Sequence, residues 1–181
     1  MVYILLGSGF EETEAVAPCD LMRRAGIEVC LVGVDGEYVR SSHGITVKTD
    51  CTLSEVELDA SEMIVLPGGL RGVQTLLASR EALDIVKNAW AAGKYVAAIC
   101  AAPTVLASVG IVGTSRATCY PGMEDRMWEA RTCPDQGVVV DGRLITGRAA
   151  GSSIDFGLAL ITALRGEETA NKIAAGIVYL S

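Results

Sequence analysis

A cysteine stands where an apolar segment passes into a predicted helix. Residues 95–99 read as a buried strand, Cys100 follows them directly, and two small residues precede Pro103. A thiol at the start of a helix meets free backbone N–H groups and the positive end of the helix dipole. Both favour the thiolate and can lower a cysteine pKa from about 8.5 to roughly 3.5–7.5. We therefore interpret Cys100 as a nucleophilic, oxidisable thiol presented at a strand-to-helix turn.

The position of Cys100 is insufficient by itself for a pKa shift of that size. A shift of about three pKa units corresponds to about 4 kcal/mol, whereas a helix dipole typically contributes about 0.3–1 kcal/mol and at most about 2. A second donor must hydrogen-bond the thiolate, either a protonated carboxyl group or further backbone N–H groups. Without such neighbours Cys100 is better explained as an inert buried side chain, because free cysteine is among the most buried residue types.

Glu14 is the candidate for the protonated carboxyl group. It falls on the first turn of the helix that follows the predicted strand 2–6, at the same end of the sheet as Cys100. A carboxyl group that points into a crevice and loses its solvent keeps its proton and can donate a hydrogen bond. The competing explanation is that Glu14, like Glu11 and Glu12, only interacts favourably with the dipole of its helix.

The turn before that helix, Gly7-Ser8-Gly9, superficially resembles a dinucleotide-binding turn. The third glycine of that fingerprint is absent. Three carboxylates at the helix N-terminus would also repel the pyrophosphate that such a turn holds. The sequence therefore argues against a nucleotide site here.

A pair of glycines, Gly68 and Gly69, leaves a third predicted strand at the same end of the sheet. Paired glycines allow backbone N–H groups to approach a ligand closely. Together with the N–H of Ala101, they would surround an oxygen on a carbon attacked by Cys100, as an oxyanion hole does. A plain turn at the exit of a strand is the competing explanation.

The elements that must position these residues alternate between strands and helices. Consecutive apolar positions, typical of strands buried on both faces, occupy residues 2–6, 29–34, 63–66 and 95–99. Helical spacing of apolar residues occupies 15–25, 83–90, 154–161 and 170–177, with Gly26 and Gly93 as C-terminal stops of the first two. The pattern predicts a doubly wound α/β sandwich with a mostly parallel sheet and helices on both faces. In such sheets ligands bind beyond the carboxyl ends of the strands, where the three segments above lie.

Two Asp-Gly pairs indicate antiparallel ribbons beside the parallel sheet. Asp35-Gly36 and Asp141-Gly142 both lie between extended segments. The second pair, flanked by 138–140 and 144–146, is a strong signal for a small hairpin.

Length and charge limit the class of protein. A chain of 181 residues suits one domain, here residues 1–181, and no apolar run reaches the roughly 18 residues of a membrane span. The N-terminal segment lacks the basic start and cleavage site of a signal peptide, so we expect a soluble, cytoplasmic protein. A net charge of −7 repels nucleic acid and anionic membranes, which we exclude as partners.

The cysteine and histidine content argues against disulfides and metals. Six cysteines in a core-rich chain without an export signal are better interpreted as free thiols. No C-x-x-C motif occurs and His43 is the single histidine, so we predict no metal site.

Three stretches together closely resemble the DJ-1/ThiJ/PfpI superfamily, and within it the DJ-1 branch: GSGFEETEAVAPCDLMRRAGI, VLPGG and AAICAAPTVLA. The resemblance continues through LITGR at 144–148 and GSSIDF at 151–156. It implies a flavodoxin-like sandwich that is usually a homodimer and needs no cofactor. It places the nucleophile on Cys100, its protonated carboxyl partner on Glu14, and the backbone donors on Gly68, Gly69 and Ala101.

The resemblance also implies a choice of activities. The family includes glyoxalase or deglycase chemistry on reactive carbonyls, sensing of oxidants, and chaperone-like protection. In its better-known members a histidine lies near the nucleophile, at the position that Tyr120 holds here. A tyrosine with a reference pKa near 10 is a poor proton acceptor at neutral pH, which weakens the glyoxalase interpretation. Protease and amidotransferase activities need a histidine base, and no histidine follows His43, so we exclude them.

Two further residues have a structural and a functional explanation. His43 lies in a turn before a predicted strand, where we expect a surface or dimer contact in preference to catalysis. Cys119 lies beside Tyr120, where packing is the expected role, and resolution of an oxidised Cys100 as a disulfide is the alternative.

Three hypotheses follow. In the first, the Cys100 thiolate attacks a small reactive carbonyl such as methylglyoxal or its adducts, and Glu14 transfers protons. In the second, the protein is an oxidant sensor or chaperone-like protein whose Cys100 is oxidised to sulfinate, without turnover. In the third, the fold serves only as a structural dimer.

Overall fold

The computed structural model describes residues 1–179, which form a central sheet of seven strands. These are β1 (Val2–Leu6), β2 (Val29–Gly33), β5 (Cys51–Thr52), β6 (Met63–Leu66), β7 (Tyr95–Ile99), β10 (Val138–Asp141) and β11 (Leu144–Gly147). Their order is β10-β11-β7-β6-β1-β2-β5, and all neighbours are parallel except β10 and β11. The predicted mostly parallel sheet is confirmed.

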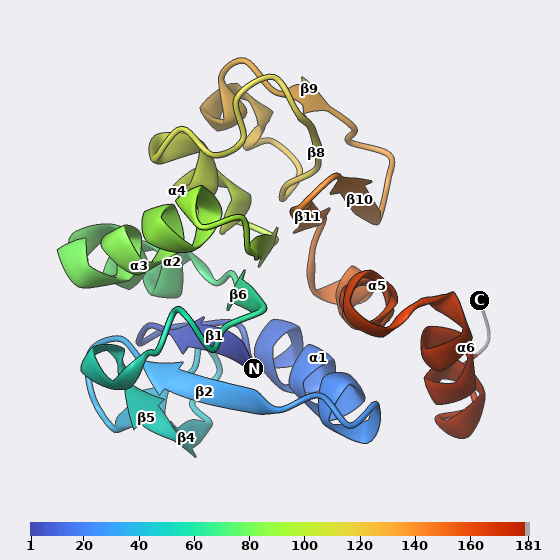
Figure 1. Ribbon diagram of the computed structural model, residues 1–181. Helices are drawn as coiled ribbons and strands as arrows, with labels where there is room; N and C mark the ends of the chain where they lie inside the picture. The colour runs from blue at the N-terminus through green and yellow to red at the C-terminus, as the bar shows by residue number, and fades with distance from the viewer. Residues whose placement is uncertain (180–181) are drawn as a thin grey trace.

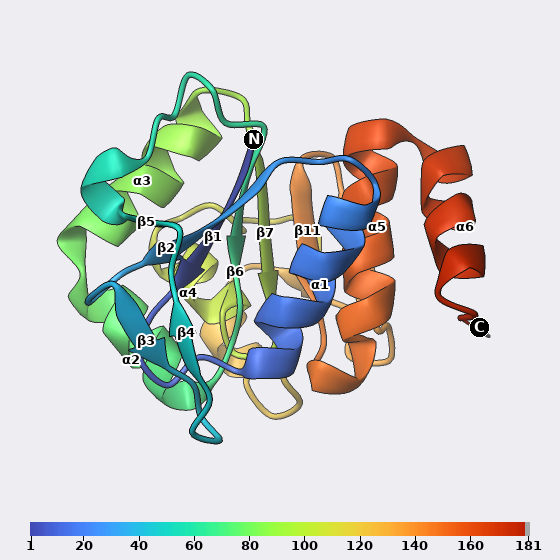
Figure 2. The same ribbon diagram turned by 90° about the horizontal axis from the view of Figure 1, so that it is seen from below.

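Helices cover both faces of this sheet (Figures 1 and 2). On one face lie α1 (Glu12–Arg24) and α5 (Ser153–Arg165), with α6 (Glu167–Gly176) packed outside α5. On the other face lie α2 (Leu70–Ala78), α3 (Arg80–Ala91) and α4 (Pro103–Ser108). The short 3₁₀ helices are Leu53–Glu55, Glu124–Met127 and Ala150–Ser152. The sandwich predicted from the alternating pattern is therefore confirmed.

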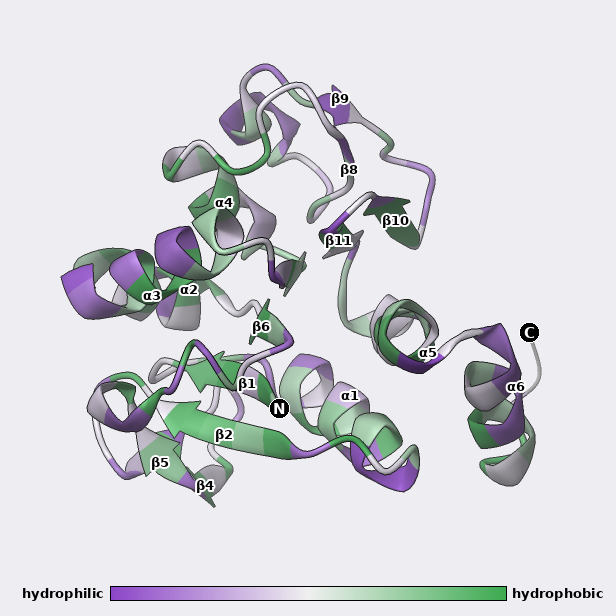
Figure 3. Ribbon diagram, viewed as in Figure 1, coloured by the Kyte–Doolittle hydropathy of each residue, from purple (hydrophilic) through white to green (hydrophobic). Residues whose placement is uncertain are grey.

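Alternate side chains of the central strands build two hydrophobic cores. In β1, Leu5 faces the core under α2, α3 and α4, whereas Ile4 and Leu6 face the core under α1 and α5. All three are fully buried. This burial on both faces explains the uninterrupted apolar runs in the sequence, visible as green strands in Figure 3. It also makes the strands rigid supports for the loops that follow them.

The two Asp-Gly pairs have different outcomes. The hairpin β10–β11 turns through Gly142, whose φ is +60°, as predicted. The predicted ribbon at Asp35-Gly36 is wrong, because β2 is already paired with β1 and β5 and has no free edge. Instead the Asp35 carboxylate accepts the Ser8 N–H at 3.0 Å. The ribbon forms further on, between β3 (Tyr38–Arg40) and β4 (Thr46–Lys48).

Other elements depart from the sequence pattern in detail. The sequence did not predict the helix α2, although its apolar residues recur at helical spacing. The strand β5 is a two-residue edge strand with no periodicity. A second small pair joins β8 (Arg116–Ala117) to β9 (Arg131–Thr132). Within residues 1–179, no helix combines the length and apolarity needed to cross a membrane.

Candidate active site

Cys100 lies immediately after β7 in an unusual backbone conformation. Its φ is +65°, in the left-handed region that costs a non-glycine residue about 1–2 kcal/mol. Two hydrogen bonds hold it there: its N–H donates to the Gly147 carbonyl at 2.9 Å, and its carbonyl accepts the Tyr120 N–H at 2.7 Å. The strand β11 and the loop around Tyr120 thus fix the residue that sequence reasoning placed at a strand-to-helix turn.

The helix after Cys100 contributes less than the sequence suggested. α4 begins only at Pro103 and is six residues long, so a short turn separates its N-terminus from the thiol. The backbone N–H groups that stabilise a negative charge on the sulfur are those of Gly69 and Ala101. Local donors from two loops therefore replace the helix dipole as the main backbone contribution.

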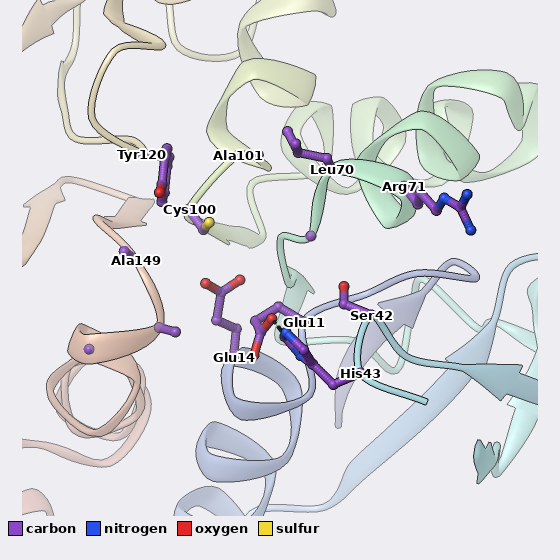
Figure 4. A pocket seen from close by; sticks show the side chains of 13 residues that line it. Glu11, Glu14, Ser42, His43, Leu70, Arg71, Cys100, Ala101, Tyr120 and Ala149 are labelled. Carbon is purple, nitrogen blue, oxygen red and sulfur yellow. Dashed lines mark ion pairs between the residues drawn. The ribbon is translucent and has the colours of Figure 1, made fainter. Parts of the chain in front are cut away.

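Glu14 lies on the first turn of α1 and is completely buried. Its Oε2 accepts the Gly68 N–H at 2.8 Å. Its Oε1 is buried and has no hydrogen-bond partner among residues 1–179. Figure 4 shows the carboxyl group pointing from α1 toward Cys100. A buried carboxylate oxygen without a partner destabilises the folded protein, so burial favours the protonated form of Glu14. The protonated carboxyl group can donate a hydrogen bond to a thiolate at Cys100.

The glycine loop after β6 allows these two groups to approach each other. A Cβ on Gly68 would come within 2.7 Å of both the Cys100 Cβ and the Glu14 Oε2. Gly69 has a φ of +88°, and a Cβ there would collide with the Gly9 carbonyl. The expected role of Gly68 needs correction, since its N–H is already donated to Glu14. Gly69 and Ala101 remain the candidates for stabilising an anion.

A Gly68→Ala substitution is expected to destabilise the protein by about 1–3 kcal/mol, because the new methyl group would overpack the Cys100–Glu14 contact. The matched control is Gly176→Ala at the end of α6, where a Cβ meets nothing within 4 Å. Urea unfolding of both variants measures the difference. Equal midpoints for the two variants would show that the loop after β6 accommodates the methyl group without strain.

Burial sets the protonation of the pair. Loss of solvent raises the pKa of Glu14 to about 7, against the smaller opposing effects of the neighbouring Cys100 thiol and of the Gly68 N–H. Burial first, and then the charge of Glu14, raise the pKa of Cys100 to about 12, against the smaller effect of the Gly69 and Ala101 N–H groups. The lowered thiol pKa expected from sequence is therefore corrected to a raised one. Between about pH 7 and 12, the two groups hold one proton and one negative charge between them.

The pair lies on the wall of a cavity of about 590 Å³ (Figure 4). Tyr120, which was assigned to the pocket from the sequence, lines it and is about half exposed, at 48%. Leu70 and Ala101 add apolar wall, and residues 149–151 close the side beyond β11. Residues 149–151 were missed in the prediction from sequence. They follow the carboxyl end of β11, and ligands of such sheets bind beyond the carboxyl ends of the strands, so this rule predicts them too.

His43 also lines this cavity, which the sequence did not predict. Its Nδ1 lies 3.2 Å from the Glu12 Oε2 and 3.5 Å from the Glu11 Oε2. The adjacent Glu12 carboxylate raises the pKa of the imidazole. Ser42 anchors the tip of the β3–β4 ribbon by donating its N–H to the Phe10 carbonyl at 2.8 Å. No local pattern signals this return of the ribbon.

The other cysteine considered for the site packs in the core. Cys119 is 2% exposed and belongs to the core beneath α4, and burial raises the pKa of its thiol to about 11. This supports the packing role, and a disulfide with Cys100 stays the untested alternative. All six cysteines are free in the structure.

The chain is similar to several known proteins. The model of the DJ-1/PfpI family matches residues 1–163. Protein dj-1beta of Drosophila melanogaster is 36% identical over 177 residues, covering 97% of this chain and 95% of its own. A deglycase of Pyrococcus abyssi is 35% identical over 151 residues, covering 83% and 90%. The structure of oxidized DJ-1 from Toxoplasma gondii superimposes with a TM-score of 0.94 at 36% identity, covering 99% of this chain and 98% of that one.

Proposed function

The chain belongs to the DJ-1/PfpI family, and from that premise we propose that it is a cofactor-free enzyme acting on reactive carbonyls. Its substrate is a small dicarbonyl such as methylglyoxal, or the adduct that methylglyoxal leaves on a protein or nucleotide. The observation that carries this proposal is the buried Glu14 carboxyl group, with one unpartnered oxygen, pointing toward Cys100 on the wall of the cavity. The deglycase among its relatives supports an activity of this type.

The first step forms a carbon–sulfur bond. The reactive form of the pair has its single proton on Glu14. The Cys100 thiolate of this form adds to the aldehyde carbon of methylglyoxal, and the carbonyl oxygen becomes an alkoxide. The N–H groups of Gly69 and Ala101, which oppose the rise in the pKa of the Cys100 thiol, are the proposed donors to this alkoxide. The alkoxide takes the proton of Glu14 and becomes the hydroxyl of a hemithioacetal.

The second step moves hydrogen between neighbouring carbons. The Glu14 carboxylate removes the C–H proton of the hemithioacetal carbon to give an enediolate. The hydroxyl proton passes from the first oxygen to the second, and Glu14 returns its proton to the adjacent carbon. The product is a thioester of lactate on Cys100. Water hydrolyses the thioester, so that methylglyoxal and one water yield one lactate ion and one released proton, and the pair regains its single proton. No histidine lies at position 120, so both proton transfers are assigned to Glu14.

The direct test is to follow purified wild-type protein with methylglyoxal by proton NMR, without glutathione or metal. We expect lactate to appear in step with methylglyoxal loss over many turnovers per protein chain. Loss of methylglyoxal without lactate, or a reaction that stops after one equivalent, would contradict the proposal.

An oxidant sensor is the second candidate function, and the same N–H groups favour it. The Gly69 and Ala101 N–H groups favour a thiolate at Cys100, and N–H donors of this kind also bind the charged oxygens of a sulfinate. No imidazole lies at position 120 to assist turnover. The homodimer and cytoplasmic location implied by the resemblance stay predictions for either function.

Mild hydrogen peroxide is expected to add two oxygens to Cys100 before any other cysteine becomes a sulfinate. Peptide mass spectrometry over a peroxide titration measures the order. A sulfinate that forms first on Cys133, a cysteine outside the cavity, would argue against a sensor at Cys100.

A further inference from the structure

Two cysteines outside the active site lie in direct contact. The Sγ atoms of Cys30, on β2, and Cys51, on β5, are 2.8 Å apart. Both side chains are partly exposed, so a small oxidant can reach them. The sulfur atoms of a disulfide are about 2.05 Å apart, so an approach of about 0.8 Å would join this pair.

The strand pairing explains the contact. β2 and β5 are parallel, with Val32 opposite Cys51, and Cys30 lies two residues before Val32 on the same face of the sheet. The residues between the cysteines hold this register: the Asp50 N–H donates to the Leu31 carbonyl at 2.8 Å, and the Asp50 carboxylate accepts the Leu31 N–H at 2.9 Å. The two thiols are therefore held side by side by the backbone.

The position of Asp50 is itself fixed from a second element. Arg23, in the last turn of α1, donates to the Asp50 Oδ2 at 2.8 Å and to the Val29 carbonyl at 2.9 Å. One guanidinium group thus ties the start of β2 to the residue before Cys51. Neither cysteine can move far from the other without breaking these bonds.

We propose that Cys30 and Cys51 form a second redox site, in which a hydroperoxide converts the two thiols into a disulfide that ties β2 to the edge strand β5. This site is separate from Cys100 and does not depend on the function proposed for it.

The step balances with hydrogen peroxide as the oxidant. One of the two sulfurs attacks the peroxide, the O–O bond breaks, and a sulfenic acid and one water form. The other sulfur then attacks the sulfenic sulfur and expels a second water. Two thiols lose two protons and two electrons in total, and one peroxide is reduced to two waters.

The disulfide would close a loop that reaches the active-site cavity. The chain between the two cysteines contains the whole β3–β4 ribbon, and its tip carries Ser42 and His43 to the cavity wall. Closing a loop of this length restricts the unfolded chain. We expect the oxidised protein to show a thermal unfolding midpoint roughly 5–10 °C above that of the reduced protein.

The experiment uses the wild-type chain treated with hydrogen peroxide, blocked with N-ethylmaleimide and digested with trypsin without reductant. The two cysteines fall on separate tryptic peptides, residues 25–40 and 49–71, each with one cysteine. We expect a linked species two hydrogens lighter than the sum of these peptides. It should persist in Cys100→Ser and disappear in Cys30→Ser.

Two results would overturn the proposal. One is recovery of both peptides as separate N-ethylmaleimide adducts after Cys100 has been fully oxidised in the same sample. The other is detection of the linked peptide in oxidised protein whose thermal unfolding midpoint equals that of the reduced protein. This result would show that the disulfide does not stabilise the pairing of β2 with β5.

Discussion

Replacing Cys100 with serine is expected to lower lactate release from methylglyoxal by at least about 10³-fold. The serine hydroxyl occupies nearly the same volume, so the cavity and the backbone hydrogen bonds at this residue are retained. A hydroxyl beside an acid with a pKa near 7 cannot supply the alkoxide needed to attack an aldehyde. The loss should therefore appear in kcat, measured as initial rates of lactate formation at saturating methylglyoxal.

The matched control for this variant is Cys133→Ser. Cys133 is a free thiol that is absent from the cavity wall, so its replacement should leave the rate within about twofold of the wild type. Equal rates in Cys100→Ser and the wild type would show that methylglyoxal reacts elsewhere or without the protein, and the carbonyl mechanism would have to be abandoned.

Replacing Glu14 with glutamine is expected to lower turnover by about 10²–10⁴-fold. A glutamine oxygen can still accept the Gly68 N–H, and its amide can face the sulfur, so the fold should survive. What the amide cannot do is take the C–H proton and return it. Asp20→Asn, another carboxylate on α1 but exposed, is the control that should keep its activity. Wild-type turnover by Glu14→Gln would assign the proton transfers to another group.

The same variant should change how stability depends on pH. An unfolded glutamate titrates near 4.5, whereas Glu14 in the folded protein titrates near 7. Between these values the folded protein keeps a proton that the unfolded chain has lost. The contribution of Glu14 to the free energy of unfolding is therefore complete below about pH 4.5 and declines as pH rises. Above pH 7 the free energy of unfolding is lower by about 3 kcal/mol. Urea unfolding at pH 5 and 8 should show this decline in the wild type and a smaller one in Glu14→Gln.

Much of the site could be predicted because it is built from local patterns on rigid strands. Consecutive apolar residues reveal β1, β6 and β7. The rule that ligands bind beyond the carboxyl ends of such strands is enough to bring Glu14, Gly69 and Cys100 together. The residues that follow β11 obey the same rule and could have been included.

What the sequence could not predict depends on contacts between distant segments. His43 reaches the cavity only because the β3–β4 ribbon folds back onto Phe10, and Cys30 meets Cys51 only because the two-residue strand β5 pairs with β2. The Gly68 N–H could donate to a substrate oxygen or to Glu14, and only the folded structure shows that Glu14 accepts it. The direction of the Cys100 pKa depends on the balance between burial and donors, which the residue types alone do not determine.

The central claim is that Cys100 and Glu14 share one proton at neutral pH. The rate of Cys100 alkylation by iodoacetamide as a function of pH, followed by mass spectrometry in the wild type and in Glu14→Gln, tests it most directly. We expect the wild-type rate to rise through about pH 7, where the pair loses its first proton, and then to level off. In Glu14→Gln the rise should move to higher pH, because a buried thiol without an ionisable partner keeps its proton. Identical profiles in both proteins, each rising near the ordinary thiol pKa of about 8.5, would contradict the account.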